Sequence, residues 1–115
     1  MPANGGEGKN DTLGVESAMR SYVILSNWTD QGVKNSRDTL KRAKAFRTVI
    51  ENRRGKVREH LYTLGEYDIL TVAEFPDDET AAAAVLTLAS FGNVRVKTMR
   101  AFTDGETAAI IAQLG

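Results

Sequence analysis

The segment at residues 62–70 most constrains the fold, because it predicts a β-hairpin in the middle of the chain. Two alternating, β-prone runs flank the pair Gly65 and Glu66. A Gly-X pair between such runs is typical of a two-residue type II′ turn, in which the glycine takes a positive φ. That turn pairs Tyr62 with Ile69, so we expect two adjacent antiparallel strands there.

Periodicity before the hairpin predicts a strand and a helix. The apolar, β-branched run at residues 21–28 is typical of a strand covered on both faces. A helix follows a polar loop, with Asn35 or Ser36 as its cap and Gly55 as its left-handed stop. Its apolar stripe consists of Leu40, Ala43, Phe46, Val49 and Ile50.

The second half of the chain repeats this pattern. Acidic residues at 77–79 predict the start of a helix over residues 78–91, which Gly92 ends. From Asn93 to residue 100 the sequence alternates as a strand, and a capping box at residues 103–106 opens a short C-terminal helix. The order predicts an α+β, ferredoxin-like split βαββαβ fold with an antiparallel four-stranded sheet.

Composition excludes several kinds of site and partner. The 115 residues fit one domain and carry no net charge, which argues against a domain that coats nucleic acid or membrane. The absence of cysteine excludes disulfides, thiolate nucleophiles and sulfur-ligated zinc. Residues 1–20 are polar and Gly-rich, so we expect a flexible N-terminal tail before a single domain at residues 21–115. With no apparent export signal or membrane span, we expect a soluble, cytoplasmic protein.

The expected sheet has more apolar surface than its own helices can cover. A βαββαβ unit carries its helices on one face, yet the strand at residues 21–28 is apolar on both faces. We also expect Tyr62 and Ile69 on the uncovered face of the hairpin. The C-terminal helix is too short to shield four strands, so we expect a second copy of the chain to cover this face.

Several spaced motifs resemble the GYD domain family, which takes its name from the residues here numbered Gly65, Tyr67 and Asp68. The matching segments lie at residues 22–32, 65–68, 92–95 and 100–102, so the resemblance covers roughly residues 21–114. It implies a ferredoxin-like fold of the dimeric α/β barrel type, in which the sheets of two subunits pack face to face. It implies no established activity, because the family is uncharacterised in function.

Two interpretations of the GYD motif stay open at this point. In a regular strand Tyr67, Tyr62 and His60 share one face and Asp68 lies on the other, so Tyr67 and Asp68 do not form a dyad. In the structural interpretation Gly65 supplies a positive φ, Tyr67 packs and Asp68 accepts hydrogen bonds from the backbone or from Thr63. In the functional one, Tyr67, Tyr62 and His60 surround a pocket between subunits that suits a small aromatic or carbonyl ligand.

The other candidate residues are few. Trp28 ends the first strand beside polar groups that could orient a ligand, and His60 is the one histidine and the candidate catalytic residue. We expect no metal site, because capping explains the acids at 77–79, and no cofactor, because no dinucleotide or phosphate-loop motif occurs. The basic stripe of Arg37, Lys41 and Lys44 lacks interleaved aromatic residues and is typical of a solvated helix face rather than a nucleic-acid site.

These observations lead to two functional hypotheses. The first is a non-enzymatic, homo-oligomeric module that binds a small ligand at the subunit interface or has a structural role. The alternative is a cofactor-independent enzyme of isomerase or monooxygenase type, acting on a small aromatic or carbonyl compound with His60 in its pocket. Fold analogy alone does not decide between them.

Overall fold

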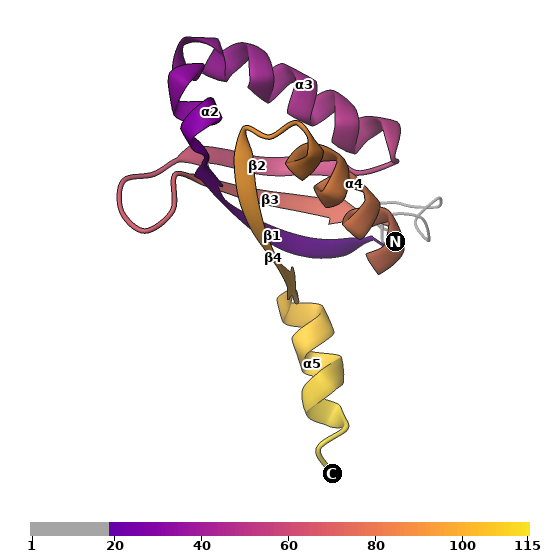
Figure 1. Ribbon diagram of the computed structural model, residues 1–115. Coiled ribbons are helices and arrows are strands. Elements are labelled where there is room, and N and C mark those ends of the chain that lie inside the picture. The colour runs from indigo at the N-terminus through magenta and orange to yellow at the C-terminus, as the bar shows by residue number, and fades with distance from the viewer. Residues whose placement is uncertain (1–18) are drawn as a thin grey trace.

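Four antiparallel strands form one sheet, and two helices pack on one of its faces (Figure 1). The computed structural model describes residues 19–115. The elements are β1 (Arg20–Trp28), α2 (Asp30–Lys34), the 3-10 turn η2 (Ser36–Asp38), α3 (Thr39–Asn52), β2 (Lys56–Tyr62), β3 (Ile69–Phe75), α4 (Asp78–Ser90), β4 (Val94–Ala101) and α5 (Asp104–Ala112).

The strand order β2-β3-β1-β4 confirms the predicted α+β, ferredoxin-like arrangement. Residues 1–18 of the expected N-terminal tail lie outside the described residues, and β1 already begins at Arg20. The division into tail and domain stays a prediction. Within residues 19–115, no helix has the length and apolar character needed to cross a membrane.

The core lies between the sheet and the helices α3 and α4. Alternate residues of the central strands point to this side, where the ring of Tyr22 meets that of Phe75 edge-on at 5.7 Å between centroids. Small residues on α4 let its backbone approach the sheet closely. The buried hydrophobic residues are Tyr22, Ile24, Ile50, Ala73, Phe75, Ala81, Ala84 and Leu88.

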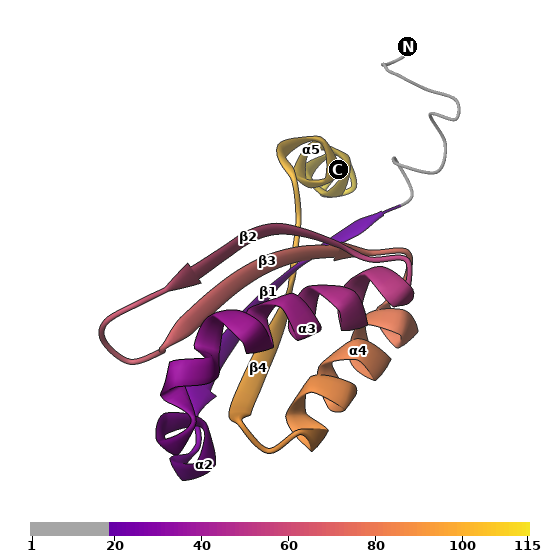
Figure 2. The same ribbon diagram turned by 90° about the horizontal axis from the view of Figure 1, so that it is seen from above.

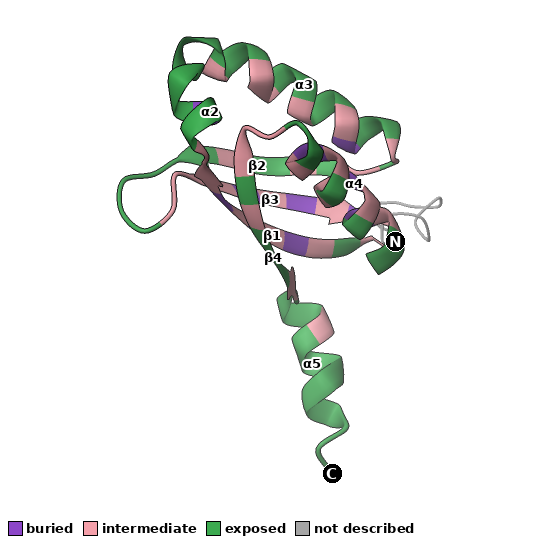
Figure 3. Ribbon diagram, viewed as in Figure 1, coloured by how far each residue is buried: buried purple, intermediate pink, exposed green. Residues whose placement is uncertain are grey.

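The opposite face of the sheet, called here the open face, carries no helix within the described residues (Figure 2). The pairing of strands places two apolar rows across it. One row is Val72, Val23 and Met99, and the other is Leu61, Leu70 and Leu25. Leu61 is 51% exposed and Met99 is 49% exposed. Figure 3 shows exposed residues along β2 and β4. The predicted excess of apolar surface is therefore present, although other residues form it: Tyr62 and Ile69 lie on the helix side, and the expectation for them was wrong.

The hairpin has the predicted pairing but a different turn. Tyr62 pairs with Ile69, whereas residues 63–68 form a six-residue loop instead of a two-residue turn. Asp68, the last residue of this loop, is bound to β1. Its N–H donates to the carbonyl of Ser26 at 2.9 Å, and its carboxylate accepts the N–H of Trp28 at 2.9 Å. Its carbonyl also accepts the N–H of Thr63 at 2.9 Å, so Asp68 links the end of β2 to β1.

The first long helix differs from its prediction at both ends. It begins at Thr39, because the preceding residues form α2 and η2. At its end the left-handed residue is Arg54, with φ 64°, and the assignment of Gly55 as the left-handed stop was wrong. Gly55 serves close packing, since a Cβ there would lie 2.7 Å from both Ile50 and Phe75. Leu40, expected in the apolar stripe, is 71% exposed.

The C-terminal helix α5 points away from the sheet, on the side opposite to α3 and α4 (Figures 1 and 2). The predicted capping box is present, because Thr103 accepts the N–H of Glu106 and the Glu106 carboxylate accepts the N–H of Thr103. An ion pair of 3.1 Å between Glu106 and Arg100 ties the helix to β4. Ile110 and Ile111 are partly exposed on it.

Candidate ligand-binding site

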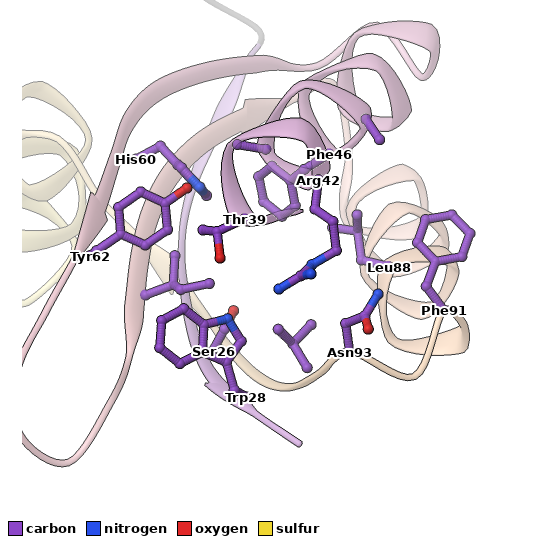
Figure 4. A pocket seen from close by; sticks show the side chains of 14 residues that line it. Ser26, Trp28, Thr39, Arg42, Phe46, His60, Tyr62, Leu88, Phe91 and Asn93 are labelled. Atoms are coloured by element: carbon purple, nitrogen blue, oxygen red, sulfur yellow. The ribbon is translucent and has the colours of Figure 1, made fainter. Parts of the chain in front are cut away.

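A cavity of about 140 Å³ lies between the sheet and the helices, near the end of β1 (Figure 4). It is lined by residues from β1, β2 and α3 on one side and by the junction of α4 and β4 on the other. Its lining includes the side chains of Trp28, Arg42, Phe46, His60, Tyr62, Leu88 and Val94.

Two connections hold this end of the sheet together. Thr29 caps α2 and joins it to the turn before β4: its N–H donates to the carbonyl of Asn93 at 3.1 Å and its hydroxyl donates to that of Gly92 at 2.6 Å. The amide of Gln31 donates to the Asn93 side chain at 3.0 Å. Gly92 turns with φ 82°, as expected for a left-handed helix stop. The two loops therefore form a rigid end wall beside the cavity.

His60 lies in an aromatic environment beside the cavity. Its Nδ1 is 2.9 Å from the hydroxyl of the buried Thr71, and its ring centroid is 5.0 Å from that of Phe46 and 5.3 Å from that of Tyr62. Burial lowers the pKa of His60 below its ordinary value, and the positive charge of Arg47 lowers it further. His60 is therefore neutral near pH 7. In this form its ring can donate one hydrogen bond and accept another without bringing a charge into the cavity.

The structure brings together three of the four predicted ligand-binding residues. Trp28, His60 and Tyr62 all line the cavity, and Tyr67 does not. Tyr67 belongs to the loop of residues 63–68, where the Nζ of Lys97 lies 5.7 Å from its ring centroid. The expectation that Tyr67 shares a face with His60 was wrong because a regular alternation does not continue through this loop.

The cavity also lies in a different place from the predicted one. It is formed by a single chain, between the sheet and the helices, whereas the sequence predicted a pocket between two subunits. His60 and Tyr62 face the helices because they pair with Thr71 and Ile69 on that side of β3. A β-bulge between Val57 and Glu59 shifts the alternation by one residue, so Val57 lies on the same side of β2 as His60.

The contacts of the motif residues agree with a structural interpretation of the GYD motif. Gly65 has φ 128°, and Asp68 accepts the backbone N–H of Trp28. The hydroxyl of Thr63 donates to the carbonyl of Tyr67 at 2.6 Å and closes the loop. These bonds tie the hairpin to the end of β1 and so fix the strand that carries Trp28.

Sequence reasoning missed Arg42 as a residue of the site. Its guanidinium points into the cavity (Figure 4), where it donates to the carbonyl oxygens of Asn35 and Gly32. The only sequence signal was its position directly before Ala43, at the border of the apolar stripe of α3. A basic residue at such a border can turn its charged end toward either side.

The acids at the start of α4 act as helix caps. The carboxylate of Asp77 accepts the N–H of Thr80 at 2.7 Å, and this hydrogen bond lowers the pKa of Asp77. Within residues 19–115, no group of three or more His, Cys, Asp or Glu side chains is arranged to hold a metal ion.

Comparison with known proteins identifies the family. The GYD domain model matches residues 22–111, so the chain belongs to the GYD domain family, and the predicted resemblance is confirmed. A relative from Thermus thermophilus is 34% identical over 97 residues, covering 84% of this chain and 99% of the relative. That relative is named "Glutamine synthetase and cystathionine beta-lyase binding protein".

Proposed function

We propose that this chain is a binding module that holds a small molecule in the cavity between its sheet and α3. The observation that carries the proposal is the convergence of Trp28, His60 and Tyr62 on one cavity, with Phe46 facing them from the helix. Concave, largely apolar sites with a few polar groups are the usual form of small-molecule sites. A cavity of about 140 Å³ is close to the ~150 Å³ that accommodates benzene in a protein core.

A cavity-filling variant tests this proposal. Native mass spectrometry of protein purified from its own host, together with a screen of small aromatic compounds by Trp28 emission, reports binding. Replacing Ala43, which lines the cavity, by leucine should reduce binding, because the larger side chain occupies the space. The matched control is Ala82→Leu on the exposed side of α4. The proposal is wrong if the wild-type chain binds none of the compounds. It is also wrong if Ala43→Leu binds them as tightly as the wild-type chain does.

We further propose that a second copy of the chain covers the open face. The two apolar rows of the open face support this dimer. Two charged residues at the edges of these rows favour one orientation of the second copy. Glu59 ends the row of Val72, Val23 and Met99 at the β2 edge, and Lys97 ends the other row at the β4 edge. A two-fold axis along the strands places the β2 edge of one copy over the β4 edge of the other, so that opposite charges meet.

Sedimentation of charge variants tests this arrangement. We expect the wild-type chain to be a dimer at micromolar concentration and Leu25→Lys to be a monomer, because lysine interrupts the apolar centre of the face. Glu59→Lys and Lys97→Glu should each weaken the dimer, and the double variant should restore it. Thr48→Lys, on the exposed side of α3, is the control. A folded wild-type monomer at this concentration contradicts the proposal.

Binding of a partner enzyme is a second candidate function, and the name of the Thermus relative favours it. The relative matches over 84% of this chain, so the shared region includes the sheet and both packed helices. The test is gel filtration of the chain mixed with glutamine synthetase or with cystathionine beta-lyase from its own host. Co-elution supports this function, and separate elution of all components at tens of micromolar dismisses it.

The enzymatic alternative assigns catalysis to His60. Its ring lines the cavity and is neutral near pH 7, which suits an acid–base group. Once a substrate is found, His60→Ala should abolish turnover while leaving assembly intact. Full activity of this variant would remove the assignment.

A further inference from the structure

Arg42 brings a positive charge into the cavity without a matching negative charge. Its guanidinium donates to two main-chain carbonyls, those of Asn35 and Gly32, and to no carboxylate within residues 19–115. Because the group is planar and carries several N–H donors, these two bonds fix its orientation and leave further donors free. Figure 4 shows that its end points into the cavity, toward the wall formed by Trp28.

The other groups around the cavity do not neutralise this charge. No aspartate or glutamate is among the described lining residues, and His60 is neutral near pH 7. On its outer side Arg42 borders a shallower hollow with Asp38 and Lys41, whose opposite charges offset one another. A guanidinium beside an apolar wall attracts an anion more strongly than one in open water, because the surroundings screen it less.

The walls of the cavity define the rest of the ligand. Phe46, Leu88, Val94 and Trp28 present apolar surface, and the volume of about 140 Å³ is close to the ~150 Å³ that holds one benzene ring. A flat carboxylate can accept two parallel hydrogen bonds from the planar guanidinium. We therefore propose that the cavity selects small ring compounds that carry a single carboxylate, which Arg42 binds. This inference rests on the proposed ligand-binding function and adds the chemical class of the ligand.

The experiment compares benzoate with benzamide, which have nearly the same size and shape but differ in charge. Trp28 is the one tryptophan of the chain and lines the cavity, so its emission reports the binding of either probe. We expect the wild-type chain to bind benzoate roughly ten- to a hundred-fold more tightly than benzamide, the usual range for a hydrogen bond to a charged group. In Arg42→Gln this preference should disappear. Arg37→Gln, exposed outside the cavity, should keep it.

The three other outcomes separate the two proposals. Equal binding of benzoate and benzamide by the wild-type chain would overturn the carboxylate selectivity and leave the ligand site in place. Binding of neither probe would count against both. Benzoate preference that survives in Arg42→Gln would assign the anion to another group. Binding of benzamide by Arg42→Gln, at wild-type affinity, shows that the variant has kept the shape of its cavity.

Discussion

Replacing Gly32 by alanine tests how the end wall of the cavity is built. Gly32 is buried in α2, and a Cβ added to it would lie 2.1 Å from the carbonyl oxygen of Asn93. The contact is with backbone, so no side-chain rotation relieves it. To reach ordinary van der Waals contact at ~3.5 Å, the two segments must separate by roughly 1 Å or more. This movement stretches the 3.1 Å hydrogen bond from the N–H of Thr29 to the same oxygen.

Two effects of opposite sign decide the result. Alanine is a better helix former than glycine, which favours the variant by about 0.5–1 kcal/mol. Overpacking costs about 1–3 kcal/mol, and a weakened backbone hydrogen bond costs about 1 kcal/mol more. We therefore expect Gly32→Ala to lower the free energy of unfolding by about 1–3.5 kcal/mol. For a domain of this size that corresponds to a fall in Tm of roughly 5–25 °C.

The assay is thermal unfolding followed by circular dichroism, with all variants at one protein concentration because association raises Tm. The matched control is Gly105→Ala in α5, where the nearest atom to the added Cβ is 4.0 Å away. Helix propensity acts alone there, so its Tm should stay level or rise. If Gly32→Ala is as stable as the wild-type chain, the close approach of α2 to Asn93 does not limit the size of residue 32.

Two further predictions concern hydrogen bonds near the cavity. Asp68→Ala should lower the free energy of unfolding by about 1–2 kcal/mol, because the N–H of Trp28 loses its acceptor. Asp68→Asn keeps an oxygen and should cost less; denaturant titration followed by Trp28 emission measures both, and equal losses would contradict the assignment. His60 has a lowered pKa, so the unfolded chain binds its proton first as pH falls below the ordinary value of 6.5. Stability should therefore decline from that pH downward, and His60→Gln should flatten the decline in urea titrations between about pH 5 and 7.5; an unchanged slope would contradict this.

Features governed by neighbouring residues were predictable from the sequence. The capping box at Thr103 and the cap at Asp77 each depend on a side chain and an N–H three residues later, so the spacing alone identifies them. The βαββαβ order was predictable because the hydrophobic period within each segment identifies it as a strand or a helix. The pairing of Tyr62 with Ile69 was also predicted correctly, because the two residues are equally distant from the Gly65–Glu66 pair at the tip of the hairpin.

Features that depend on distant contacts were not predictable. Asp68 forms hydrogen bonds with β1, about forty positions away in the sequence, and a Gly-X turn pattern contains no signal for them. The bulge after Val57 places Val57 on the same side of β2 as His60, and nothing in the local sequence marks it. Gly55 is required for close packing against Ile50 and Phe75, and this contact exists only in the folded core.

The isolated position of α5 makes its helicity a measure of assembly. A helix of nine residues is too short to be stable in water by itself, even with a good cap. If the second copy supplies the surface on which Ile110 and Ile111 rest, α5 folds only in the dimer. Dilution below the dissociation constant should then melt α5 while the sheet stays intact, and the amide protons of residues 104–112 would exchange at a rate set by protein concentration.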